Sequence, residues 1–141
     1  DIIVGSMMGA SEYVAERAKQ VFDQSDVDST IHLQPKLDEL NVDNIWLVIT
    51  STHGAGDLPD NIQPFAEELT QNIIKPKAYG VIALGDSSYD TFCFGGKTMD
   101  ELLNQTGAHK VGNRLEIDVL EHFVPEDYAE EWLNHWLHLL N

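Results

Sequence analysis

The sequence predicts an α/β fold, a three-layer sandwich around a five-stranded parallel sheet of strand order 2-1-3-4-5. Three observations support this prediction. Two nearly unbroken apolar runs, Ile45 to Thr50 and Tyr79 to Leu84, are typical of strands that are buried on both faces. Stretches with apolar residues at helical spacing alternate with the strand-like runs. Each run ends abruptly in a loop of glycines and polar residues.

The first half of the chain predicts three strands and two helices. Ile2 to Val4 is a short strand, and the helix after it has apolar residues at spacings of three and four, namely Val14, Ala18, Val21 and Phe22. Thr30 to Leu33 is a second strand, and its polar neighbours favour an edge position. The strand from Ile45 follows. The next helix begins at Pro59 and ends before Pro76.

The second half predicts two more strands and two more helices. After the strand that ends at Leu84, a helix buries Met99, Leu102 and Leu103 and ends near Gly107, where glycine suits a left-handed cap. Val111 to Val119 is the fifth strand. The last helix begins at Glu126 and carries a steady apolar stripe that consists of Ala129, Trp132, Leu133, Trp136, Leu137 and Leu140.

Length and charge bound the class of protein. The 141 residues predict a single domain over residues 1–141. The formal net charge of −16 comes from 24 acidic residues against 8 Lys plus Arg. Such a surface repels nucleic acid, whose binding depends on cationic side chains, and it favours a basic partner surface. The alternative is that the acidity mainly serves solubility.

Cysteine content and hydropathy indicate the cellular compartment. Cys93 is the single cysteine, so the chain has neither an internal disulfide nor a metal cluster of several thiolates. No apolar run is long enough for a membrane span, and the sequence shows no basic n-region followed by an apolar h-region. We therefore expect a cytoplasmic protein without membrane contact. We also expect no metal site, because His135 and His138 have no third ligand nearby.

The loop between the first strand and the first helix is the first candidate ligand site. It consists of Ser6, Met7, Met8, Gly9, Ala10 and Ser11. Unpaired backbone N–H groups at the start of a helix favour an anion, and serine hydroxyls add donors, so the loop suits a phosphate monoester. It has no lysine and no Gly-Lys-Ser/Thr ending, which indicates binding rather than transfer of the phosphate. The alternative is that Ser11 simply caps the helix.

Two further candidate loops follow the third and fourth strands, at the edge of the sheet where open α/β sheets bind ligands. The first contains Ser51, Thr52, His53, Gly54, Ala55 and Gly56, and the second contains Gly85, Asp86, Ser87, Tyr89, Asp90, Phe92 and Cys93. A flat ring system fits between His53 and Tyr89, because stacking on an aromatic face is worth roughly 1 kcal/mol beyond burial. The alternative is that His53 is a turn residue and Tyr89 a surface residue.

The residues of these two loops carry a resemblance to a known family. Ser51 to Asn61 and Ala83 to Cys93 resemble the two FMN-ring loops of flavodoxins, and more narrowly those of diflavin reductases and short stand-alone flavodoxins. The resemblance spans essentially the whole chain. It implies a flavodoxin-like fold in which residues 6–11 wrap the phosphate of FMN, Gly54 presents its peptide to the flavin N5, and Tyr89 stacks on the ring. Two positions depart from the family: Met8 replaces a threonine, and His53 stands where relatives often have an aromatic residue.

The resemblance also implies a function. We expect a monomeric electron carrier, not an enzyme, which receives electrons from an NADPH-dependent flavoprotein reductase. The acceptor would be an iron–sulfur or haem enzyme, and the resemblance to short flavodoxins suggests biotin synthesis. An NAD(P)H-dependent FMN or quinone reductase is the alternative. A receiver-type signalling module shares the architecture, but it needs a phospho-accepting Asp where this chain has Ser51 and Thr52.

Overall fold

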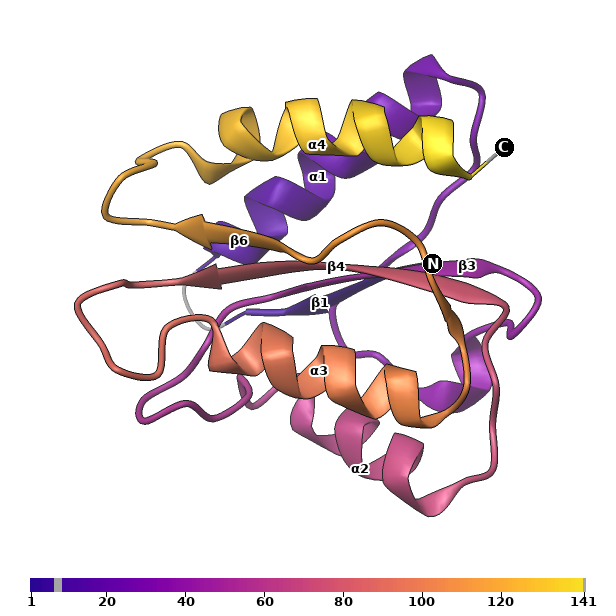
Figure 1. Ribbon diagram of the computed structural model, residues 1–141. Helices are drawn as coiled ribbons and strands as arrows, with labels where there is room; N and C mark the ends of the chain where they lie inside the picture. Colours follow the sequence, from indigo (N-terminus) through magenta and orange to yellow (C-terminus); the bar gives the residue numbers. More distant parts are fainter. Residues whose placement is uncertain (7–8, 141) are drawn as a thin grey trace.

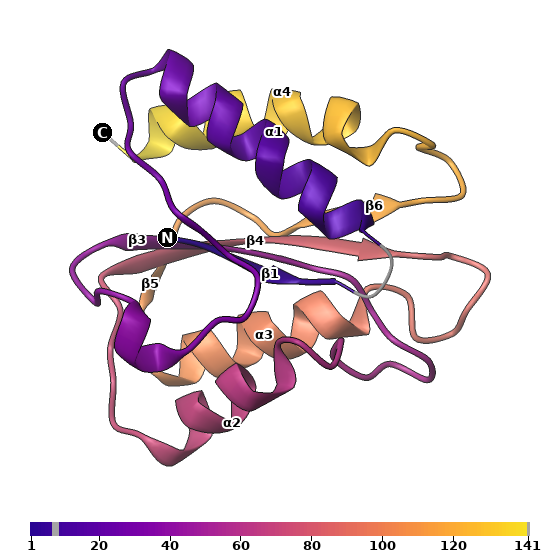
Figure 2. The ribbon, with the colours of Figure 1, turned by 180° about the vertical axis from the view of Figure 1, so that it is seen from behind.

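The computed structural model describes residues 1–6 and 9–140 and confirms the predicted three-layer architecture (Figure 1). The strand order of the parallel sheet is β2-β1-β3-β4-β5, and β6 also pairs with β4. Helices α1 (Ala10–Gln24) and α4 (Pro125–Leu139) cover one face of the sheet. Helices α2 (Gln63–Gln71) and α3 (Phe94–Gln105) cover the other, as the view from behind also shows (Figure 2).

The centre of the sheet consists of β1 (Ile2–Gly5), β3 (Ile45–Thr50) and β4 (Ala78–Gly85). These are the three apolar runs that the sequence predicts as strands, and nearly every residue in them is buried. The parallel register of β3 and β4 runs from Ile45 opposite Ala78 to Thr50 opposite Ala83. The two strands therefore end almost level, so the loops that follow them start side by side.

Two apolar cores lie on the two faces of the sheet. The core under α1 and α4 includes Val14, Phe22 and Trp136, and the core under α2 and α3 includes Phe65 and Met99. The buried positions of each helix follow the spacing of three and four that predicts the helix. Burial of each such large side chain stabilises the fold by roughly 1.5–3 kcal/mol.

Two element boundaries differ from the prediction. The edge strand β2 is limited to Ile31–His32, and a 3₁₀ turn, η1 (Leu37–Glu39), follows it. Helix α2 begins at Gln63, four residues later than predicted, because residues 59–62 form a turn in which Ile62 N–H donates to the carbonyl of Pro59 at 3.1 Å. The late start leaves a polar segment between β3 and α2.

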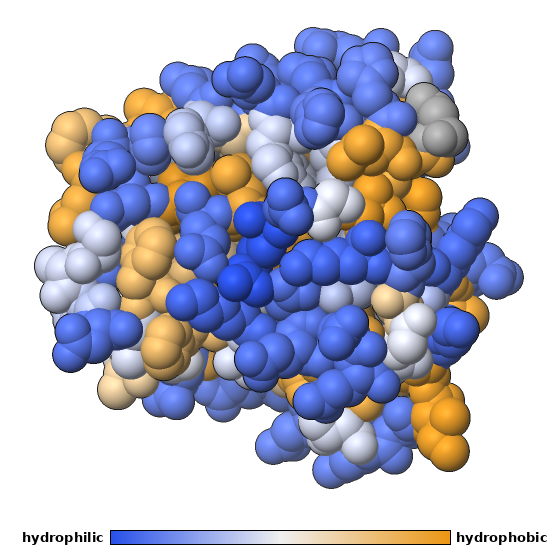
Figure 3. Space-filling view, viewed as in Figure 1, coloured by the Kyte–Doolittle hydropathy of each residue, from blue (hydrophilic) through white to orange (hydrophobic). Residues whose placement is uncertain are grey.

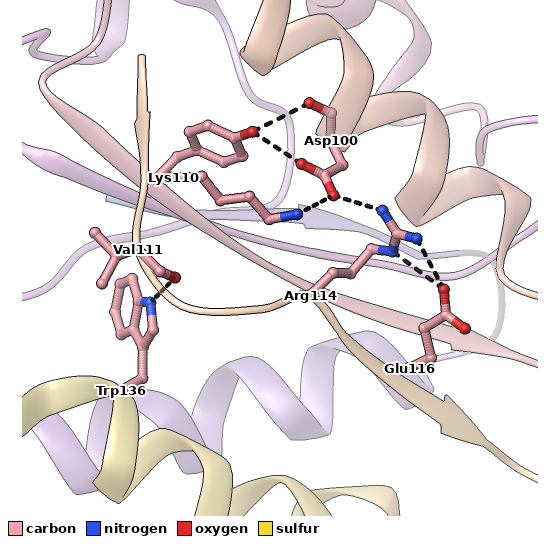
Figure 4. Close-up of polar contacts among 7 residues, drawn as sticks. Asp100, Lys110, Val111, Arg114, Glu116 and Trp136 are labelled. Carbon is pink, nitrogen blue, oxygen red and sulfur yellow. Dashed lines mark hydrogen bonds and ion pairs between the residues drawn. The ribbon is translucent and has the colours of Figure 1, made fainter. Parts of the chain in front are cut away.

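The predicted fifth strand, Val111 to Val119, is wrong in its extent because it is broken into β5 (His109–Lys110) and β6 (Leu115–Asp118). Both pieces pair with β4. Between them, Val111 N–H donates to the backbone carbonyl of Tyr79 at 2.8 Å. The carbonyl of Val111 accepts the indole N–H of Trp136 at 3.0 Å (Figure 4). The chain then turns at Gly112, which has a φ of 69°. Contact with the last helix thus interrupts the strand.

A buried carboxylate joins α3 to this broken edge of the sheet (Figure 4). Asp100 is only 5% exposed. Its carboxylate accepts hydrogen bonds from the Tyr79 hydroxyl at 2.8 Å, from Lys110 Nζ at 2.7 Å and from Arg114. Arg114 also pairs with Glu116 at the start of β6. The network therefore connects α3 with β4, β5 and β6 through charge-assisted hydrogen bonds.

Burial alone would raise the pKa of Asp100, but the hydrogen bonds from Lys110, Tyr79 and Arg114 outweigh it. The pKa of this carboxyl is therefore held below its ordinary value. A depressed pKa means that the ionised form stabilises the folded chain.

Replacement of Asp100 by Asn is expected to lower the free energy of unfolding by about 2–4 kcal/mol at neutral pH, because two cations lose their buried partner. The charge of Asp100 stabilises the fold above its unfolded pKa of about 3.9, and this contribution is lost as pH falls through the lower folded pKa. The difference in the free energy of unfolding between wild type and Asp100→Asn should thus be smaller at low pH. Urea unfolding at about pH 7 and about pH 3 measures this difference. Asp38→Asn, at an exposed carboxylate in η1, is the control, and an equal loss at both pH values would contradict the prediction.

Candidate functional site

A cavity of about 400 Å³ opens at the carboxyl edge of the sheet, where the loops after β1, β3, β4 and β6 meet. Its lining residues are Ala10, Ser51, Thr52, His53, Gly54, Leu84, Gly85, Asp86, Tyr89, Thr91 and Val119. A second cavity, also of about 400 Å³, lies at the opposite edge and includes Phe22, Lys77 and Trp136. We regard the first as the candidate site, because ligands of open α/β sheets bind at the carboxyl ends of the strands.

The loop after β3 is a tight turn that is closed by its own backbone. His53 N–H donates to the carbonyl of Asp57 at 2.7 Å, and Asp57 N–H donates back to His53 at 2.8 Å. Gly54 lies at the tip with a φ of 52°, a conformation that glycine adopts at little cost. A Cβ at Gly54 would meet no atom within 4 Å. Gly54 is also exposed and lines the cavity, so a ligand there can reach its peptide group.

The loop after β4 is organised by Asp86. The carboxylate of Asp86 accepts hydrogen bonds from the N–H and the hydroxyl of Ser88, and its carbonyl accepts Tyr89 N–H at 3.1 Å. These bonds hold Tyr89 at the rim of the cavity, where its side chain is 62% exposed. An aromatic ring in this position would lose much of its exposure against a flat ligand.

The loop after β3 packs directly against the start of α3. Thr52 Oγ1 accepts the N–H of Gly95 at 3.0 Å and donates to the carbonyl of Leu84 at 3.5 Å. A Cβ at Gly95 would lie 2.4 Å from the carbonyl oxygen of Ser51, so only glycine allows this approach. The two cavity loops are thus fixed relative to each other before any ligand binds.

The start of α1 forms the third side of the site. Gly9, in the left-handed region with a φ of 90°, occupies the N-cap position, and its N–H donates to Ser6 Oγ at 3.0 Å. The interpretation of Ser11 as the N-cap is wrong. Ser11 lies inside the helix, is fully buried and shares a hydrogen bond with Ser51 Oγ at 2.7 Å. The N–H groups of the first turn, which have no partner within the helix, start at Ala10 on the cavity wall.

The structure brings together eight of the predicted site residues as lining of the cavity: Ala10, Ser51, Thr52, His53, Gly54, Gly85, Asp86 and Tyr89. Other predicted residues lie in the same three loops but outside the lining: Ser6, Gly9, Ser11, Ala55, Gly56, Ser87, Asp90, Phe92 and Cys93. Met7 and Met8 lie outside the described residues. The thiol of Cys93 is buried behind the loop and donates to the carbonyl of Ala83 at 3.5 Å.

Three lining residues were missed by the sequence analysis. Leu84 and Thr91 belong to segments that it did select, whereas Val119 directly follows β6. The carboxyl end of a neighbouring parallel strand is the signal that would have found Val119. Asp118, one residue earlier, accepts the N–H of Ser87 at 3.2 Å and so joins β6 to the loop after β4.

The described parts of the chain, residues 1–6 and 9–140, hold no group of three His, Cys, Asp or Glu side chains that could bind a metal ion. His135 and His138 are exposed. No helix among them has the length and apolar character that crossing a membrane requires.

Comparison with known proteins decides the family. The family model described as Flavodoxin matches residues 2–132. The chain belongs to the flavodoxin family. It is 42% identical over 143 residues to Protein MioC of Escherichia coli K12, an alignment that covers 99% of this chain and 96% of MioC. It is also 42% identical over 144 residues to Flavodoxin YqcA of the same strain, with 99% and 97% of the two chains covered.

Solved flavodoxins have the same fold. A mutant of flavodoxin from Pseudomonas aeruginosa superposes with a TM-score of 0.92 at 37% identity and covers 99% of this chain and 96% of that one. A flavodoxin of Streptococcus pneumoniae TIGR4 gives a TM-score of 0.84 at 28% identity, with 99% and 94% covered. The chain is therefore a flavodoxin-like electron-transfer protein and a homologue of MioC. Its family implies a flavin cofactor and redox partners.

The residues of this flavodoxin fit a flavin. The tip peptide at Gly54 is open, the ring of Tyr89 is exposed at the rim, and the first turn of α1 offers N–H groups at Ala10. These groups lie on three sides of one cavity, as a ligand with a flat ring and a terminal phosphate requires.

Replacement of Thr52 by Val is expected to lower the free energy of unfolding of the flavin-free protein by about 1–2 kcal/mol, because Gly95 N–H loses its acceptor. Thr52→Ser retains the hydroxyl and should keep most of this stability, so it is the matched control. Urea unfolding of the two variants beside wild type measures the difference. Equal stability of Thr52→Val and wild type would show that the hydroxyl does not hold the two loops together.

Proposed function

We propose that this flavodoxin binds FMN in the cavity at the carboxyl edge of the sheet and carries electrons between two partner proteins. The observation that supports the proposal is the convergence of three unlike elements on one cavity. These elements are the start of α1 at Ala10, the open peptide of Gly54 and the exposed ring of Tyr89. Bound FMN would supply the one- and two-electron redox chemistry.

The residues of the loop between β1 and α1 would hold the phosphate. The dianion would lie at the N-terminus of α1, where N–H groups and the helix dipole favour negative charge. Ser6 already accepts the N–H of Gly9, which shapes the turn into the helix. The chain places no lysine in this loop. Binding would therefore rest on backbone and hydroxyl donors rather than on a counter-ion.

The other two loops would hold the ring. Tyr89 would cover one face, while Gly54 would present its peptide at the N5 edge, where a glycine can reverse the peptide direction at little cost. His53 would lie on the opposite side of the ring. Three acidic residues, Asp57, Asp86 and Asp90, belong to the same loops and would disfavour added negative charge on the ring. Their field would keep the reduction potential low.

The redox partners are proposed by chemical class. The donor would be an NADPH-dependent flavoprotein reductase, and the acceptor an iron–sulfur or haem enzyme. The net charge of −16 supports a docking surface for basic proteins. A role in biotin synthesis is part of the proposal, and it rests on the resemblance to short stand-alone flavodoxins. We further propose that the chain acts as a cytoplasmic monomer.

Titration with FMN and with riboflavin tests the site. FMN is expected to bind saturably with quenching of its fluorescence, and riboflavin at least about tenfold more weakly, because it lacks the phosphate that the helix N-terminus attracts. Fluorescence at fixed flavin and rising protein measures both affinities. Equal affinities would show that the loop between β1 and α1 does not bind the phosphate. If neither flavin binds, the cavity is not a flavin site.

Incubation with NADPH separates the carrier from the alternative, an NAD(P)H-dependent FMN or quinone reductase. The FMN-loaded protein is expected to stay oxidised in anaerobic NADPH, since a carrier receives electrons only through its reductase. The absorbance of its oxidised flavin should fall once a flavodoxin reductase is added in catalytic amount. Rapid bleaching by NADPH alone would favour the reductase function.

A further inference from the structure

The loop between β6 and α4, residues 119–124, presents apolar side chains to solvent. Phe123 is 88% exposed, and Leu120 and Val124 are each 49% exposed. Figure 3 shows apolar residues at the left of the molecule, where this loop lies in Figure 1. Isolated exposed apolar residues are ordinary, but a group of them on one loop marks an interaction surface.

Hydrogen bonds fix the shape of the 119–124 loop. The carboxylate of Asp118 accepts Leu120 N–H at 3.1 Å, and its carbonyl accepts the N–H groups of Glu121 and His122 at 3.1 and 3.0 Å. The ring of His122 stacks on Tyr128 of α4 with centroids 3.7 Å apart. Phe123 is thus held out on an ordered turn, and such preorganisation lowers the entropy that a partner must overcome on binding.

The same loop borders the candidate flavin site. Val119 is part of the cavity wall, and Asp118 bonds Ser87 of the loop that carries Tyr89. A protein that covers Phe123 would therefore also lie over the cavity edge. Electron transfer requires such proximity between the flavin and the redox centre of the partner.

Acidic residues surround the apolar centre of this surface. Glu121 lies in the loop, Glu126 and Asp127 lie in the first turn of α4, and Asp86 and Asp90 lie in the neighbouring loop. Arg17, the cation that contacts Asp127, is also paired with Glu130. An apolar centre with a charged rim is the usual composition of a protein–protein interface.

The charge identifies the occupant. A second copy of this chain would bring the same net charge of −16, and an anionic membrane surface or a nucleic acid would also be repelled. A basic protein is attracted. We propose that the 119–124 loop is the docking site of a redox partner protein, in which Phe123 enters an apolar socket that is ringed by Lys and Arg side chains. This proposal rests on the carrier function proposed above.

The test uses a purified bacterial NADPH-dependent flavodoxin reductase and the FMN-loaded protein. Anaerobic stopped-flow absorbance gives the rate of flavin reduction at rising flavodoxin concentration. Phe123→Ser is expected to raise the concentration for half-maximal rate about five- to twentyfold and to leave the limiting rate unchanged, because a central aromatic anchor contributes to association. Phe123→Leu should recover part of the loss. Glu121→Gln should weaken the dependence on salt.

Ile73→Ser is the matched control, since Ile73 is a fully exposed apolar residue in the connection from α2 to β4. It should behave as wild type. The affinity for FMN should be equal in all these proteins. If only Phe123→Ser loses FMN affinity, Phe123 covers the flavin instead, and the proposal is overturned.

The remaining outcomes distinguish the two proposals. If the wild-type protein takes up no FMN, or takes up FMN but accepts no electrons from the reductase, the carrier function fails and the docking proposal fails with it. If the wild-type protein is reduced and Phe123→Ser has the same half-maximal concentration, only the docking proposal is overturned.

Discussion

The parallel pairing of β3 with β4 is the constraint on which the site depends. Six residue pairs in register, from Ile45 opposite Ala78 to Thr50 opposite Ala83, bring the two strands to the same edge. Because both strands are covered on both faces, a slip of one residue would move apolar side chains from one core to the other. The two cores therefore fix where the glycine-containing loops start, and the loops need only a few bonds of their own to complete the cavity.

Those few bonds come from residues that serve two elements at once. Thr52 joins the loop after β3 to the start of α3, and Asp118 joins β6 to the loop after β4. On the opposite side of β4, Asp100 joins α3 to the strands beyond it. Each neutral bond contributes only about 1 kcal/mol, and bonds to charged groups somewhat more. These bonds matter for function because they hold the walls of the cavity in place while its rim stays accessible.

The sequence predicts the parts of this structure that depend on local pattern. Uninterrupted apolar runs identify β1, β3 and β4, and the glycine and hydroxyl content of the loops after them identifies most of the cavity lining. The break in the fifth strand could not be predicted from local pattern, because it depends on a hydrogen bond between Trp136 and Val111, which lie 25 positions apart in the sequence. The position of Ser11 inside α1 depends on the left-handed turn at Gly9, and the role of Val119 on strand order.

The environment of Cys93 has a consequence for measuring motion. The side chain lies at the junction of the loop after β4 with α3, is fully buried, and burial raises the pKa of its thiol to about 12. Thiolates, not thiols, react with alkylating and disulfide reagents. The folded protein should therefore resist such reagents until this junction opens. Because Cys93 is the single cysteine of the chain, the rate at which its thiol is labelled reports the local opening of one wall of the cavity.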